Sequence, residues 1–300
     1  MSDPVLVDEA LFARWPLPEP GSEKHARGTI LMVGGSATVP GAMLLAGDAA
    51  LRAGGGKLQV ATTDSVAAQM AVSIPEALVS RMPESLSGDI SAEAADRIAD
   101  LAEGATAVLI GPGMTDPAAA VRLLRELVPR LSHQRVVVDA LASAYVTEDV
   151  ECLRHLETRA ILTLNHSELS LTLGVDQDEV DEDPLGAAAR LAERAEAVVL
   201  CGGEDKYVAT PDGDGWQITA GVPGLGVSGS GDVQAGIVTG LVAGGADPAQ
   251  AAAWGGWLHG SAGESLARSV GPVGFLAREL PAAVPPLLAR LRGMSDDTQH

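Results

Sequence analysis

Short apolar runs alternate along the chain with longer segments that repeat apolar residues at helical spacing. The runs TILMV, AVLI and RVVVD, which begin at residues 29, 107 and 135, each contain three or four consecutive apolar residues, as is typical of strands buried on both faces of a parallel sheet. Segment 116–131 carries a helical repeat, and Asp116 followed by Pro117 is typical of a helix start. This order of strand, helix and strand predicts an α/β fold around a mostly parallel sheet.

Other segments extend the pattern. Residues 75–82 read as an edge strand, residues 90–105 and 184–195 as helices, and two short strands around the turn 211–215 as an antiparallel pair. The acidic run VDQDEVDED at 175–183 lacks the glycine of a calcium-binding loop, so we expect a solvated loop there.

The chain is expected to form one large domain. Residues 1–23 are rich in proline and polar residues and predict an irregular lead-in, residues 24–292 the domain itself, and residues 293–300 a disordered tail.

Composition and charge narrow the class of ligand. The 300 residues are 46% hydrophobic but only 3% aromatic, which suits small-residue packing of helices on a sheet, and the formal charge is −20. That charge argues against binding of nucleic acid or an anionic membrane, and it requires that an anionic ligand be held by local donors. Cys152 and Cys201 are too few for a disulfide framework and lack metal-site spacing. We expect a cytoplasmic protein with no signal peptide or membrane span.

A glycine-rich turn that opens into an apolar helix, GVPGLGVSGSGDVQAG at 221–236, is the most informative stretch. The first amides of a helix have no partner within it, and the helix dipole favours an anion there. Asp232 falls at the start of this helix, where it could act as a helix cap or accept a proton beside a bound phosphate. Four glycines before Asp232 favour the second interpretation, because capping needs no such backbone freedom.

This segment closely resembles the anion-hole and catalytic-base motif of the ribokinase-like superfamily, in particular of the nucleotide-dependent NAD(P)H-hydrate dehydratases, whose pattern reads roughly GNPG-x-ATGG-[ST]-GDVLAG. Residues 34–62 also resemble the family pattern GGS-x5-GA-x2-LA-x2-AALRAGAG-x3-VAT, and the resemblance extends from about Lys24 to Leu291. It implies a ribokinase-like three-layer sandwich. It also implies dehydration of hydrated NADH or NADPH (NADHX or NADPHX) with ADP or ATP and Mg²⁺.

The resemblance assigns roles to individual residues. Asp232 is the catalytic base, and the amides of Gly229, Ser230 and Gly231 form the anion hole. The implied substrate-binding residues are Gly34, Gly35, Ser36, Ala42, Gly111, Gly113, Asp139, Asn165, His166 and Asp232. The implied nucleotide-binding residues are Cys201, Gly202, Gly203, Glu204, Asp205 and Gly231. Glu168 is expected near the metal, through water.

Several of these residues have structural alternatives. Asp139 could cap the turn that follows it, His166 could be an exposed residue at a helix start, and Glu168 an ordinary carboxylate of a first helical turn. His259 is more typical of a packed core residue than of a ligand. Cys201 ends an apolar strand and is not expected to be a nucleophile.

The chain departs from the family pattern at Leu141, Cys201, Asp205, Val222 and Val227. These changes keep open a weakly active or inactive nucleotide-binding protein. A superfamily kinase acting on a vitamin precursor also stays open, because its base and anion hole would be identical. By resemblance we also expect a homo-oligomer, a tetramer. Since no epimerase domain fits before residue 24, we expect a separate NAD(P)H-hydrate epimerase as pathway partner.

Overall fold

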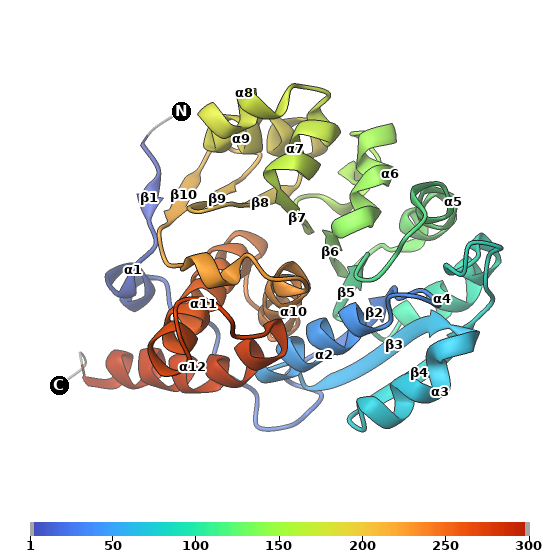
Figure 1. Cartoon of the computed structure of the whole chain (residues 1–300), viewed down its shortest axis with the longest axis horizontal. Helices are drawn as coiled ribbons and strands as arrows, with labels where there is room; N and C mark the ends of the chain where they lie inside the picture. The colour runs from blue at the N-terminus through green and yellow to red at the C-terminus, as the bar shows by residue number, and fades with distance from the viewer. Residues whose placement is uncertain (1–2, 298–300) are drawn as a thin grey trace.

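The computed structural model describes residues 3–297 and places a ten-stranded sheet between two layers of helices (Figure 1). The strand order is β1-β10-β9-β8-β7-β6-β5-β2-β3-β4, and all neighbours are parallel except β8 with β9 and β9 with β10. The strands are β1 (Val5–Leu6), β2 (Thr29–Val33), β3 (Lys57–Thr63), β4 (Ala77–Met82), β5 (Ala107–Ile110), β6 (Arg135–Asp139), β7 (Ala160–Asn165), β8 (Val198–Gly202), β9 (Lys206–Ala209) and β10 (Gly215–Ile218).

The helices cover both faces of the sheet. They are α1 (Glu9–Arg14), α2 (Gly41–Arg52), α3 (Asp64–Ser73), α4 (Ala95–Ala102), α5 (Pro117–Leu127), α6 (Ser143–Glu148), α7 (His166–Leu173), α8 (Gln177–Glu182), α9 (Pro184–Ala195), α10 (Ser230–Ala243), α11 (Pro248–Ser269) and α12 (Leu280–Asp297). Short 3-10 turns lie at Ala92–Ala94, Val128–Arg130, Ala140–Ala142, Arg154–Leu156, Pro223–Leu225 and Ala277–Glu279.

Two apolar cores result, one on each face of the sheet. Successive residues of β2 point to opposite faces, so Met32 belongs to the core beneath α2, α10 and α11, while Leu31 belongs to the core beneath α4, α5 and α9. Strands buried on both faces explain the continuous apolar runs of the sequence. The predicted three-layer α/β architecture is confirmed.

Most predicted elements are confirmed as well. β4 is an edge strand, and β9 and β10 pair antiparallel. Asp116 caps α5 as predicted, since its Oδ1 accepts hydrogen bonds from the amides of Ala118 at 2.9 Å and Ala119 at 3.1 Å. No helix in residues 3–297 combines the length and the apolar character needed to span a bilayer.

The prediction of an irregular lead-in over residues 1–23 is wrong for its first half. β1 pairs with β10, and Asp8 caps α1 by accepting a hydrogen bond from the Leu11 amide at 2.8 Å. Phe12 of α1 lies 3.9 Å from Trp254 and 5.0 Å from Trp257, measured between ring centroids. The arm escaped prediction because its partners lie more than two hundred residues away in the sequence.

Two further expectations need correction. The acidic run at 175–183 contains helix α8 rather than a loop: Val180 is fully buried, and Glu179 pairs with Arg190 of α9 at 2.6 Å. The expected disordered tail at 293–300 is helical through Asp297, where α12 ends, and residues 298–300 lie outside the described part of the chain.

The docking of the N-terminal arm gives a stability prediction. Phe12→Ala should lower the free energy of unfolding by about 3–5 kcal/mol, because it empties the space between two tryptophans. Leu6→Ala, at a side chain 49% exposed on β1, is the matched control and should change stability by less than about 0.5 kcal/mol. Denaturant unfolding of both variants checks this, and equal effects would show that the arm is not part of the cooperative core.

Candidate active site

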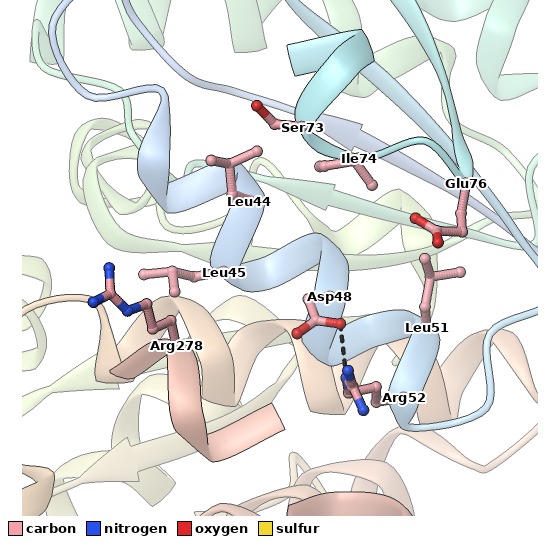
Figure 2. Close-up of a pocket in the computed structure, with 9 residues that line it drawn as sticks. All are labelled: Leu44, Leu45, Asp48, Leu51, Arg52, Ser73, Ile74, Glu76 and Arg278. Carbon is pink, nitrogen blue, oxygen red and sulfur yellow. Dashed lines mark hydrogen bonds and ion pairs between the residues drawn. The ribbon is translucent and has the colours of Figure 1, made fainter. Parts of the chain in front are cut away.

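A cavity of about 960 Å³ lies at the carboxyl ends of β6, β7 and β8, where α10 begins. Open parallel sheets bind ligands at this edge, and the volume suits a nucleotide-sized molecule. A second hollow, between α2 and α3, is about half that size (Figure 2). Its lining includes Asp48 and Arg52, which pair with each other at 2.8 Å, and it gathers none of the predicted site residues.

The start of α10 presents free backbone donors to the larger cavity. Gly229 is the N-cap residue with φ +86°, a conformation that favours glycine, and it turns the chain into the helix. The amide of Ser230 already donates to the carbonyl of Val227 at 3.1 Å. The amides of Gly229, Gly231 and Asp232 make no backbone hydrogen bond within the described residues, so they are the donors left for an anion, the last two in the first turn of α10. Sequence reasoning had not included the amide of Asp232.

Three carboxylates face one another across the cavity. Burial, with the nearby charge of Glu168, raises the pKa of Asp232 to about 6. Burial also raises the pKa of Asp139 well above its ordinary value, against a hydrogen bond of 2.7 Å from the Thr163 hydroxyl. The pKa of Glu168 is raised by burial, although its Oε2 accepts a hydrogen bond from the Asn165 amide at 2.9 Å. Asp232 is therefore ionised at neutral pH and well matched to a proton-accepting role.

A buried histidine supports the helix start. The Nε2 atom of His259, on α11, lies 2.9 Å from the hydroxyl of Ser230. Burial, with the charge of Lys206 second, lowers the pKa of His259 to about 3, so its ring is neutral. His259 is packed in the core as expected, but it also lines the cavity and holds Ser230.

Of the residues predicted for the substrate, Asp139, Asn165 and Asp232 line the cavity, whereas the glycines, Ser36 and Ala42 form a neighbouring group. Gly35, Ala42 and Gly113 lie together at the carboxyl ends of β2 and β5, since a Cβ at Gly113 would lie 3.0 Å from the Gly35 Cα and 3.3 Å from the Ala42 Cβ. Gly111 packs directly against the Asp139 carbonyl. Gly34 and Ser36 belong to the same turn, and the Ser36 hydroxyl accepts a hydrogen bond from the Val39 amide at 3.1 Å. Asp139 thus joins the substrate group to the cavity.

The segment 165–168 has mainly structural contacts. The side chain of Asn165 caps α7 by accepting a hydrogen bond from the Glu168 amide at 2.9 Å. His166 does not line the cavity: its Nδ1 lies 2.6 Å from Asp181 of α8, and its Nε2 lies beside Gly203. His166 therefore contacts the predicted nucleotide loop instead of the substrate group.

The predicted nucleotide loop lines the cavity from Gly202 to Asp205, but Cys201 does not. The thiol of Cys201 is fully buried in the core beneath α7 and α9, and burial raises its pKa to about 12. This agrees with the expectation that it is no nucleophile. Of the departures from the family pattern, Val222 and Val227 line the cavity with Asp205, whereas Leu141 packs against the apolar core.

Comparison with known proteins agrees with this geometry. The chain is 44% identical over 286 residues to the ADP-dependent (S)-NAD(P)H-hydrate dehydratase of Xanthomonas campestris pv. campestris, covering 95% of this chain and 96% of the relative. It is 35% identical to the bifunctional NAD(P)H-hydrate repair enzyme Nnr of Moorella thermoacetica, of which it spans 53%.

Solved structures give the same result. The ADP/ATP-dependent NAD(P)H-hydrate dehydratase of Bacillus subtilis, co-crystallised with ATP and Mg²⁺, superposes with a TM-score of 0.79 at 28% identity, covering 97% of this chain and all of that one. A ribokinase-like superfamily protein of Enterococcus faecalis, at 20% identity and a TM-score of 0.82 over 97% of each chain, confirms the fold alone. The family model described as NAD(P)H-hydrate dehydratase matches residues 30–286, and the chain belongs to this family.

Proposed function

We propose that this chain dehydrates hydrated NADH and NADPH back to the reduced cofactors, using ADP as phosphoryl donor. The observation that carries the proposal is the position of Asp232, a partly buried carboxylate in the first turn of α10 beside the free amides of Gly231 and Asp232. Support for ADP comes from relatives 44%, 33% and 30% identical, all named ADP-dependent dehydratases.

The site residues suit a phosphorylation followed by an elimination. Asp232 accepts the proton of the substrate hydroxyl as the hydroxyl oxygen bonds to the terminal phosphorus of ADP. The bond from that phosphorus to the bridging oxygen breaks in the same step, and AMP leaves with the electron pair. The amides of Gly231 and Asp232 stabilise the charge on the transferred phosphoryl group. The carbon–oxygen bond then breaks, phosphate leaves with the electron pair, and the ring regains its double bond as the neighbouring carbon loses a proton.

The carboxylates also fit a nucleotide-bound Mg²⁺. No three His, Cys, Asp or Glu side chains among the described residues are placed to hold a metal by themselves. Mg²⁺ is commonly bound through one or two carboxylates together with waters and phosphates, and the mutual repulsion of Asp139, Glu168 and Asp232 favours a cation between them. Glu168 would hold it through water, and its chemistry would be neutralisation of phosphate charge.

Two alternatives have less support. A vitamin-precursor kinase would share the fold, base and helix start, but the 44% identity extends over nearly the whole chain. A weakened catalyst remains a hypothesis, since Val222 and Val227 face the cavity while Cys201 and Leu141 do not. The homo-oligomer and the separate epimerase stay predictions.

The direct test incubates the purified chain with hydrated NADH or NADPH, with ADP or ATP, and with Mg²⁺. The expected result is nucleotide-dependent return of the reduced-cofactor absorbance, with stoichiometric release of phosphate. Phosphorylation of a vitamin precursor without any return of that absorbance would favour the kinase alternative.

The role of Asp232 gives a prediction about rate and pH. Asp232→Asn should lower kcat by about 100-fold or more while nucleotide binding stays intact or tightens, because an anion near the phosphates is removed. In the unchanged chain kcat/KM should fall as pH drops below about 6, where the Asp232 carboxylate becomes protonated. Steady-state kinetics from pH 5 to 8 measure both effects, and activity of Asp232→Asn within a few-fold of the unchanged chain would remove Asp232 from the mechanism.

The geometry of the turn gives a second prediction. A Cβ at Gly231 would meet no protein atom within 4 Å, so Gly231→Val should fold normally yet block the phosphate and abolish detectable nucleotide binding. Gly229→Val is the contrasting variant, because φ is +86° there and the new Cβ would collide with Leu45; it should lower the melting temperature. Calorimetric titration with ADP and thermal unfolding separate the two effects. Unchanged ADP affinity in Gly231→Val would place the phosphate elsewhere.

A further inference from the structure

The charges around the cavity are strongly unbalanced. Five carboxylates line it, and Lys206 is the one lysine or arginine among the described residues that do so. The five are Asp139, Glu168, Glu204, Asp205 and Asp232. Since His259 is neutral, a nucleotide that brings its own negative charge meets a single cationic side chain of the protein.

Lys206 is buried without an ion-pair partner. It is 4% exposed, and its Nζ donates one hydrogen bond, of 3.2 Å, to the carbonyl of Ala220. No carboxylate in residues 3–293 lies within 4 Å of this nitrogen. Burial of an ammonium without an ion-pair partner lowers the stability of the fold. Its presence in the cavity wall therefore points to a function rather than to a contribution to stability.

The two carboxylates whose charges act on Lys206 make hydrogen bonds to other residues. Asp205 accepts a hydrogen bond from the side-chain amide of Gln217 at 2.8 Å, and Glu264 accepts one from the backbone amide of Gly221 at 3.2 Å. An ammonium has three N–H donors, and Ala220 occupies one of them. The remaining donors are therefore available to a ligand.

The strand register directs Lys206 toward the start of α10. Cys201 pairs with Tyr207 across β8 and β9, so Lys206 points to the opposite face of the sheet from Cys201. On that face its stem lies 3.7 Å from where a Cβ of Gly256 on α11 would stand, and its charge acts on His259, which holds Ser230. The family pattern has its lysine at position 201. This chain has one five residues later, on the other face and in the cavity wall.

We propose that Lys206 binds a phosphate group of the nucleotide, as the charged side-chain partner of the free amides of Gly231 and Asp232. This inference rests on the proposed function for the identity of the ligand, a nucleoside diphosphate or triphosphate. The ammonium donates to phosphate oxygens and offsets the repulsion that the five carboxylates exert on them. It is a binding residue for the phosphoryl donor.

Burial makes this contact sensitive to pH. Desolvation lowers the pKa of Lys206 to about 8, with the charges of Asp205 and Glu264 opposing the shift. The other ionisable side chain packed against it, His259, stays neutral above pH 7, and Asp232 is already ionised there. The thiols of Cys152 and Cys201 have pKa values raised to about 12, so they do not titrate between pH 7.5 and 9.5. Loss of the Lys206 proton should therefore weaken nucleotide binding across this range.

The test compares the unchanged full-length chain with Lys206→Met, which keeps the length of the stem and removes the charge. Calorimetric titration with ADP and Mg²⁺ at pH 7.5 should show at least about tenfold weaker binding in the variant, the loss of one contact to a charged group. Lys24→Met removes an exposed lysine and is the matched control; its ADP affinity should not change. The melting temperature of nucleotide-free Lys206→Met should be unchanged or higher, because a buried unpaired charge is gone.

A pH series supplies a readout that needs no folded variant. Between pH 7.5 and 9.5 the ADP affinity of the unchanged chain should fall about tenfold, since most of the ammonium loses its proton over that interval. In Lys206→Met the affinity should be nearly flat. A flat profile in the unchanged chain, or equal ADP affinity in the two chains at pH 7.5, overturns the proposal.

Three further outcomes would test the role of Lys206 and the proposed function separately. A marked drop in the melting temperature of Lys206→Met with unaltered ADP affinity assigns the lysine a structural role. Failure of the unchanged chain to bind ADP or ATP overturns the phosphate assignment. If hydrated NADH is not dehydrated but ADP binding shows the expected Lys206 dependence, the proposed function fails and the assignment of Lys206 stands.

Discussion

The direct contact between the backbones of α2 and α10 is the constraint on which the site depends. A Cβ at Gly236 would collide with the Ala46 carbonyl, and one at Gly240 with the Ala50 carbonyl. The four-residue step is the same on both helices, so they run side by side in the same direction and start at the same edge of the sheet. The turn after β2, which carries the predicted substrate residues, is thereby held next to the turn that carries Asp232. Larger residues at these glycines would separate the two halves of the site.

At this edge of the sheet, the charges that line the cavity restrict which ligands can bind more than its shape does. The chain has a formal charge of −20, and its cavity gathers five carboxylates. A phosphate can be held there only where donors are concentrated, at the start of α10 and at Lys206. The carboxylates favour a cation that accompanies the phosphate, which fits a family whose Bacillus subtilis member was co-crystallised with ATP and Mg²⁺. The local donors and the accompanying metal together oppose an unfavourable overall field.

The sequence predicts the layers of the fold and the centre of the site because both have short-range signatures. Apolar runs identified the central strands β2, β5 and β6, and the glycine turn before Asp232 identified the helix start. The misses are contacts between distant segments. Phe12 finds its partners on α11, and α8 exists because Val180 is buried and Glu179 pairs with α9. Local propensity carries no information on either contact.

The roles of Lys206 and Cys201 at the site could not be predicted from the sequence for the same reason: they depend on contacts between separate segments. Lys206 reads in the sequence as one residue of a short strand after an acidic loop, and only the register of β8 with β9 places it on the cavity side. Cys201 carried the signal of the aligned family position, yet the same register turns its thiol into the opposite core. A family pattern identifies positions along the chain, whereas the face of the strand decides which of them reach a ligand.

Exclusion of water shifts the pKa values of both Asp232 and Lys206, the base and the phosphate-binding residue of the proposed reaction. Burial disfavours every charged form, so it raises the pKa of the carboxylate of Asp232 to about 6 and lowers that of the ammonium of Lys206 to about 8. Between these values both groups are charged, one able to accept a proton and the other able to hold a phosphate. A more open cavity would widen that interval but would weaken every contact to the phosphate, because water would screen it. The burial that makes the donors effective therefore also confines their joint action to a narrow range around neutral pH.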